Sequence, residues 1–92
     1  IAAKEFCTYH HIEYTFINSL SEAGLIEVTA TNEGTYIPET ELQKLERMVR
    51  LHTELEINLA GIEAITHLLQ RVESIQEETR NLRNRLKRYE ED

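Results

Sequence analysis

The chain has 92 residues, of which 40% are hydrophobic, enough for one small core but not for several domains. Ten Lys and Arg against seventeen Asp and Glu give a formal net charge of −7, so most of the surface repels nucleic acid and anionic membranes. A basic protein surface is the expected target. Cys7, the single cysteine, permits no intramolecular disulfide, and no apolar run is long enough to span a membrane. We therefore expect a cytoplasmic protein.

Two short amphipathic helices are predicted over residues 2–9 and 13–23, and Gly24 is expected to end the second as a left-handed cap. Two short helices joined by about three residues are typical of a helix-turn-helix pair. Cys7 is expected to be a small core residue rather than a reactive thiol. The apolar positions at helical spacing are Ala3, Phe6, Cys7, Phe16, Ile17 and Leu20.

A small β-hairpin, or wing, is predicted next. Residues 26–31 alternate apolar and polar side chains, and Asn32-Glu33-Gly34 turns the chain toward residues 35–37. After Pro38, Thr40 is expected to cap a third helix, with Gln43 reaching back, and this helix is expected to run to about Glu56. Its predicted inner face consists of Leu42, Leu45, Met48, Val49 and Leu55.

A single long helix is predicted from Leu59 to Glu90, roughly 48 Å in length. Asn58 is placed to cap it, and Ile57 and Ile62 have the spacing of a hydrophobic staple that fixes the direction of the helix. Gly61 would allow close packing at this point.

The long helix carries a heptad pattern in which one seam is almost entirely apolar. Ile62 and Leu69 widen the stripe in the first half, so this half is expected to pack on the rest of the chain. The second half is expected to project and pair with a second copy, the alternative being a helix folded back on its own domain. The seam consists of Ile65, Leu68, Val72, Ile75, Thr79, Leu82, Leu86 and Tyr89. The predicted dimerisation residues are Val72, Ile75, Leu82, Leu86 and Tyr89.

Nothing in the sequence indicates catalysis. There is no glycine-rich phosphate loop, no nucleophile elbow and no pair of carboxylates in an apolar setting. His10, His11, His52 and His67, together with Cys7, form no paired ligand spacing on one helix face. We therefore expect no enzyme activity, no metal and no cofactor.

The charge distribution argues against specific DNA binding. Lys4 is the only Lys or Arg among residues 1–40, which contain six glutamates. The candidate recognition helix presents Glu13 and Asn18, so it would meet phosphates with the wrong sign. Five basic residues gather instead within residues 80–88, near the end of the long helix, where the helix dipole favours cations on a solvated face.

The predicted fold is mainly α with a small β-hairpin wing: a winged helix-turn-helix over residues 1–57, including the third helix, and then the long helix over residues 58–92. This arrangement resembles the MerR superfamily, most clearly at residues 5–7 and 23–26. The sequence departs from that pattern at Asn18 and Leu20, where MerR regulators usually carry an arginine and a tyrosine, and its wing lacks the usual arginine.

Within that superfamily the chain resembles the chaperone-modulator family CbpM, through Val49-Arg50-Leu51-His52-Thr53-Glu54-Leu55, Ile57-Asn58-Leu59-Ala60-Gly61-Ile62 and Leu82-Arg83-Asn84-Arg85-Leu86. The resemblance implies a protein that binds the J-domain of a DnaJ-like co-chaperone, the curved-DNA-binding protein A (CbpA), and inhibits it by competing with DnaK. J-domains present a basic helix to DnaK, which suits an acidic modulator. A MerR-like DNA-binding transcriptional regulator is the alternative function, and an inert dimerisation module is a third.

The candidate partner-binding residues lie around the junction of the two later helices: Arg50, His52, Glu54, Glu56 and Glu63. Their alternative role is salt bridging along the helices, for example between Arg50 and Glu54. The direction of helix pairing stays open at this point. Flanking charges favour a parallel pair, with Glu78 facing Arg83 and Arg85 facing Glu90, whereas the MerR resemblance implies an antiparallel one.

Overall fold

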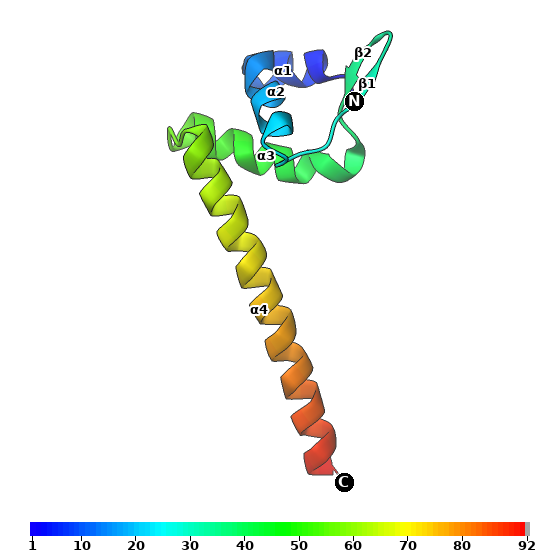
Figure 1. The fold of residues 1–92 in the computed structure, drawn as a ribbon, viewed down its shortest axis with the longest axis vertical. Helices are drawn as coiled ribbons and strands as arrows, with labels where there is room; N and C mark the ends of the chain where they lie inside the picture. Colours follow the sequence, from blue (N-terminus) through cyan, green and yellow to red (C-terminus); the bar gives the residue numbers. More distant parts are fainter. Residues whose placement is uncertain (92) are drawn as a thin grey trace.

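A computed structural model describes residues 1–91, so Asp92 of the predicted second region lies outside the described residues. Four helices and one two-stranded antiparallel sheet follow one another along the chain, which agrees with the predicted mainly helical fold with a wing. Figure 1 shows a body built from the first three helices and the wing, from which a long helix projects. The elements are α1 (Ala3–His10), α2 (Tyr14–Glu22), β1 (Thr29–Thr31), β2 (Gly34–Tyr36), α3 (Glu39–Glu54) and α4 (Leu59–Glu91).

The helix-turn-helix pair forms within one residue of the predicted bounds. Gly24 has φ +76° and follows α2, so the predicted left-handed cap is confirmed. The Gly24 N–H donates to Ser21 O at 3.0 Å and the Leu25 N–H to Leu20 O at 2.9 Å, the two bonds of a Schellman motif. This cap satisfies the last carbonyls of α2 and turns Leu25 into the core.

The wing is shorter than the alternating pattern predicted. Its strands pair Thr29 with Tyr36, Ala30 with Thr35 and Thr31 with Gly34, around a two-residue turn. The wing is attached to the body through β2 and the residue that follows it. The Tyr14 hydroxyl of α2 donates to Thr35 Oγ1 at 2.9 Å, and the Ile37 N–H donates to the Ile1 carbonyl at 2.7 Å.

Two predictions about α3 are wrong. The helix begins at Glu39, with Pro38 in the N-cap position and no side-chain cap bond, so Thr40 lies inside the helix and does not cap it. Proline suits this site because its fixed φ is compatible with a helix start. Leu55 follows the last helical residue and is 65% exposed, so it does not belong to the inner face. The helix ends at Glu54, so the helical spacing that would direct Leu55 toward the core does not continue to this residue.

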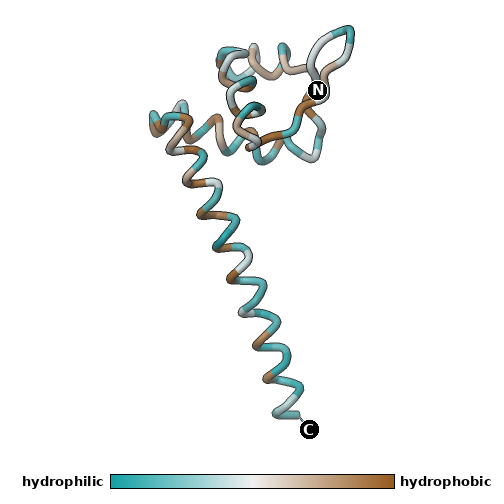
Figure 2. The backbone as a smooth tube through the Cα atoms, in the orientation of Figure 1, coloured by the Kyte–Doolittle hydropathy of each residue, from teal (hydrophilic) through white to brown (hydrophobic). Residues whose placement is uncertain are grey.

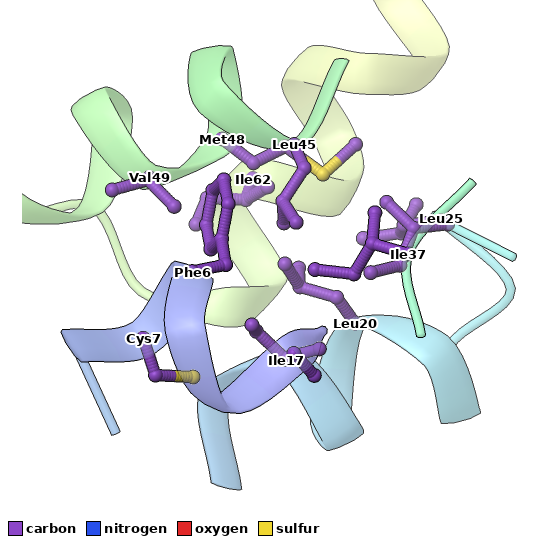
Figure 3. Packing of buried hydrophobic residues seen from close by; sticks show 12 residues of the cluster. Phe6, Cys7, Ile17, Leu20, Leu25, Ile37, Leu45, Met48, Val49 and Ile62 are labelled. Atoms are coloured by element: carbon purple, nitrogen blue, oxygen red, sulfur yellow. The ribbon is translucent and has the colours of Figure 1, made fainter. Parts of the chain in front are cut away.

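The core is one apolar cluster between the helix-turn-helix pair, the segment that follows β2, and α3 (Figure 3). Within it Phe6, Leu20, Leu45 and Ile62 are each at most 2% exposed. Ile62 is the one residue of α4 that is buried among those described, and it carries the long helix into the cluster. The remaining members are Ala3, Cys7, Ile17, Leu25, Ile26, Ile37, Met48 and Val49.

Cys7 belongs to this core, and burial raises the pKa of its thiol. Because the thiolate is the reactive form, the native protein should react with iodoacetamide roughly ten-fold or more slowly than the protein in denaturing guanidinium chloride. Mass spectrometry over time measures this rate. The matched control is Thr8→Cys in a Cys7→Ala background, since Thr8 is exposed on the same helix and its thiol should react at similar rates in both states. Equal protection at both positions would contradict the core assignment.

Residues 55–58 connect α3 to α4 and are called the elbow. Asn58 Oδ1 accepts the Gly61 N–H at 2.9 Å, which confirms the predicted cap of α4. Gly61 is required by close packing, since a Cβ at this position would lie 2.6 Å from Ile57 Cγ2. Glu56 has φ +54°, a left-handed conformation that reverses the chain between the two helices.

The remainder of α4 forms a projecting arm, defined here as residues 67–91. The predicted packing of the first half ends earlier than expected, because Ile65 and Thr66 are half-buried whereas Leu68 is 61% and Leu69 37% exposed. Figure 2 shows separate apolar turns along this otherwise polar helix. The helix does not fold back on the body in the described structure. The division of the chain at residues 57 and 58 stays a prediction.

Candidate partner-binding surface

Four of the five predicted partner-binding residues are exposed around the elbow. Arg50, His52 and Glu54 lie in the last turns of α3, and Glu56 lies in the connection to α4. Glu63 is half-buried in the first turns of α4. The sequence prediction thus named residues that gather at one end of α3, but these residues are not equally accessible.

His52 is the best-fixed member of this set. Its ring stacks on Phe16 of α2, with centroids 4.3 Å apart and planes inclined by 17°. Its Nδ1 lies 3.0 Å from the Ile57 carbonyl oxygen, and because a carbonyl can only accept, Nδ1 must carry the proton and donate. The imidazole therefore links the start of α2 to the elbow and leaves Nε2 as its second polar atom.

The Phe16 contact brings the start of α2 into the site, which sequence reasoning missed. Ile12, Glu13 and Phe16 line a shallow hollow together with His11, His52 and Thr53. Phe16 is half-buried and Glu13 is exposed, so the hollow has an aromatic wall and an acidic rim. No sequence signal joins residues 13–16 to residue 52, because the tertiary packing of α2 on α3 creates the contact.

The acidic side chains at the elbow are left without cationic partners. The ion pair found within residues 1–91 is Lys44 with Glu41 at 3.4 Å, so Arg50 and Glu54 do not form the alternative salt bridge. The α3 C-terminus adds the negative end of its dipole at this position. Leu55 stands between Glu54 and Glu56 and is 65% exposed. We call Glu13, Phe16, His52, Glu54, Leu55 and Glu56 together the elbow surface.

The face that a helix-turn-helix protein would turn to DNA contains no cation. Neither α2 nor the wing contains a Lys or Arg. The Asn18 amide donates to the Glu22 carboxylate at 3.3 Å on the exposed side of α2, so its hydrogen-bonding group is engaged within the helix. The basic residues within 80–88 lie on the arm, away from the helix-turn-helix pair (Figure 1).

Two further features are absent from the part of the chain that the structure describes. No group of three or more His, Cys, Asp and Glu side chains is placed to hold a metal ion. No helix combines the length and apolar character needed to cross a membrane.

The body and arm define a class of protein: a winged helix-turn-helix followed by a helical hairpin whose second helix projects. The sequence matches the family described as "MerR HTH family regulatory protein" over residues 1–84. The chain belongs to this family, and the MerR resemblance inferred from the sequence is confirmed.

Curated relatives support the narrower resemblance to CbpM. The chain is 29% identical over 86 residues to "Chaperone modulatory protein CbpM" of Escherichia coli O1:K1 / APEC. The matched region covers 92% of this chain and 85% of the relative. CbpM proteins of Escherichia coli O45:K1 (strain S88 / ExPEC) and O139:H28 (strain E24377A / ETEC) match with the same identity and coverage. No solved structure matches the chain significantly.

Proposed function

We propose that this chain is a non-enzymatic chaperone modulator that binds the J-domain of a DnaJ-like co-chaperone of the CbpA type and inhibits its work with DnaK. The observation that carries the proposal is the similarity to chaperone modulatory proteins along 92% of the chain. The charge of −7 supports it, because a J-domain presents a basic helix to DnaK. The cytoplasm, where DnaK acts, is the expected location.

The elbow surface is the proposed docking site on the body. It combines an exposed apolar side chain, Leu55, with three exposed carboxylates, of Glu13, Glu54 and Glu56. A basic amphipathic helix could place an apolar residue on Leu55 and the Phe16 wall, with its cations facing the carboxylates. The His52 bond to Ile57 and the left-handed Glu56 hold this surface in one conformation, which lowers the ordering cost of binding.

Charge reversal at the elbow tests both the function and its location. Glu54→Lys combined with Glu56→Lys should weaken J-domain binding at least about ten-fold, since two attractive charges become repulsive. Titration calorimetry with an isolated J-domain, at low and at physiological salt, measures this effect, and wild-type binding should weaken with salt. The matched control is Glu5→Lys with Glu27→Lys, two exposed glutamates outside the elbow surface.

Three results would count against the proposal. No heat with the folded wild-type protein at either salt would reject J-domain binding. Equal weakening by both double variants would mean that overall charge, and not the elbow surface, governs affinity. A loss of thermal stability parallel to the loss of binding would return the two glutamates to a structural role.

A DNA-binding regulator is the second candidate, favoured by the family match alone. Duplex binding whose affinity falls steeply with salt concentration would support it. The absence of Lys and Arg from α2 and the wing predicts that such binding, if it occurs, depends on the basic arm and shows little sequence preference.

Homodimerisation through α4 is part of the proposal. The predicted dimerisation residues are all exposed on the arm, from 47% at Val72 to 85% at Tyr89. The exposure of large apolar side chains to water along a single helix is unfavourable, and a second helix packed along the seam would cover them. The other three predicted dimerisation residues are Ile75, Leu82 and Leu86.

A further inference from the structure

The hollow beside the start of α2 combines an aromatic wall with negative charge. Its volume is about 500 Å³, and its lining comes from two separate parts of the chain, the connection from α1 into α2 and the last turn of α3. Within the described residues no Lys or Arg belongs to this lining. The hollow overlaps the elbow surface and has the charge to attract a cation. It is lined by His11, Ile12, Glu13, Phe16, His52 and Thr53.

The aromatic wall is flat and fixed in position. The rings of Phe16 and His52 are stacked, with centroids 4.3 Å apart. The His52 ring is also held by its bond to the Ile57 carbonyl oxygen, which lies 3.0 Å from Nδ1. Because Nδ1 donates this bond, the neutral imidazole leaves Nε2 as an acceptor. The wall thus offers a π-face for a flat cation and one acceptor atom at its edge.

The carboxylate of Glu13 supplies the negative charge. Glu13 is the N-cap residue of α2, but its side chain makes no cap bond to the helix. Its Oε2 accepts the Thr15 hydroxyl at 3.3 Å, which orients the carboxylate and leaves Oε1 to accept other bonds. Arg50 is two residues from His52 but forms no ion pair with Glu13. Within residues 1–91 this carboxylate therefore has no cationic partner.

We propose that this hollow binds the guanidinium group of one arginine side chain supplied by a protein partner. The flat guanidinium stacks on the aromatic wall, its paired N–H groups donate to the Glu13 carboxylate, and a further N–H donates to His52 Nε2. The aliphatic part of the arginine side chain contacts Phe16 and Ile12. The inference rests on the proposed function and adds the chemical group that the elbow surface recognises.

Lysine fits the hollow less well than arginine. An ammonium group is compact and strongly hydrated, so it neither stacks flat on a ring nor donates two parallel bonds to one carboxylate. A free small cation is also a poor ligand, because the hollow is shallow and leaves much of the ligand in water. A partner that also covers the exposed Leu55 delivers its arginine at high effective concentration, and the covered surface excludes water from the ion pair.

An exchange of arginine for lysine in the partner tests this selectivity at constant charge. Titration calorimetry compares an isolated J-domain with a version whose basic helix carries lysine at every arginine position. The wild-type chain should bind the lysine version about five-fold or more weakly. Glu13→Gln should weaken binding of the arginine version by a similar factor. The two changes together should add little to either one, because both remove the same contact.

The matched control is Glu22→Gln, which removes one charge from the other end of α2, outside the hollow. Its affinity should stay within about two-fold of wild type, with the full preference for arginine. Phe16→Leu should reduce that preference to about two-fold or less, since it removes a π-face and keeps an apolar side chain. Because Phe16 is half-buried, the readout is the ratio of the two affinities, which a general loss of stability would not change.

A second measurement needs no J-domain. Nα-acetyl-arginine amide, titrated to concentrations on the order of 10 mM, should shift the NMR signals of the His52 and Phe16 rings in the wild-type chain but not in the Glu13→Gln variant. Nα-acetyl-lysine amide at the same concentration should shift these signals at least about three-fold less.

The outcomes separate the arginine contact from the proposed function. Equal affinities of the wild-type chain for the two J-domains would overturn the inference and leave the proposed function standing. A preference for arginine that survives in both Glu13→Gln and Phe16→Leu would place the arginine elsewhere and overturn the inference as well. Ring shifts with the arginine derivative, but no binding of the J-domain, would overturn the proposed function alone. The absence of both signals would overturn both.

Discussion

Replacing Ile62 by alanine should lower the free energy of unfolding by about 3 kcal/mol, because the side chain is fully buried and its removal leaves a cavity in the core. For a chain of this size, such a loss should lower the melting temperature by on the order of 15 °C. The Ile62→Ala variant should also impair function more than an average core substitution does, because Ile62 is the residue of α4 that is buried in the body.

The control for this prediction is Leu55→Ala, which removes the same number of carbon atoms from a side chain that is 65% exposed. Its effect on unfolding should stay within about 0.5 kcal/mol. Denaturant unfolding followed by circular dichroism measures both variants, at one protein concentration because dimerisation contributes to apparent stability. Similar losses from the two substitutions would contradict the burial of Ile62 and the exposure of Leu55.

Local signals in the sequence predicted the elements correctly wherever neighbouring residues determine the structure. Gly24 ends α2 because only a residue that tolerates a positive φ completes the Schellman motif. Asn58 caps α4 through a bond to the N–H three residues later. Both features depend on contacts within a single turn, so the sequence alone suffices to predict them.

The predictions failed where an element ends without a local signal. The helical spacing of α3 continues through Leu55, but the chain leaves the helix at that residue and Glu56 takes the left-handed conformation usually given to glycine. Ile57 fixes this reversal, because its N–H donates to Leu51 O at 3.1 Å and its side chain packs against the core of the body. A tertiary contact therefore overrides the propensity of Glu56.

The candidate site was predicted in part for the same reason. His52 and Glu54 were found because they lie in a segment that resembles CbpM, and the structure places both at the elbow. Phe16 and Glu13 were missed because they reach the site only through the packing of α2 against α3. Leu55, assigned to the core from its spacing, becomes the apolar centre of the proposed surface.

Placing two negative charges in the seam, with Leu82→Glu and Leu86→Glu together, should raise the dissociation constant of the dimer at least about 100-fold. Each substitution removes an exposed apolar side chain that a second helix would bury, which contributes about 1.5–3 kcal/mol per residue when burial is complete. The new carboxylates would also have to be desolvated in an apolar seam. Sedimentation equilibrium over a range of concentrations measures the change.

The matched control is Asn81→Glu with Asn84→Glu. It adds the same charges on the outward side of the same helix, one residue before Leu82 and two residues before Leu86. The control should leave the dissociation constant within a few-fold of wild type, since neither position lies in the seam or next to it on the helix surface.

The seam variant should also lose helical signal by circular dichroism, because an isolated arm is only marginally stable in water. Its body should still bind a J-domain, since the elbow surface lies outside the arm. Equal effects of the two double variants would show that net charge, and not a seam between two copies, determines association.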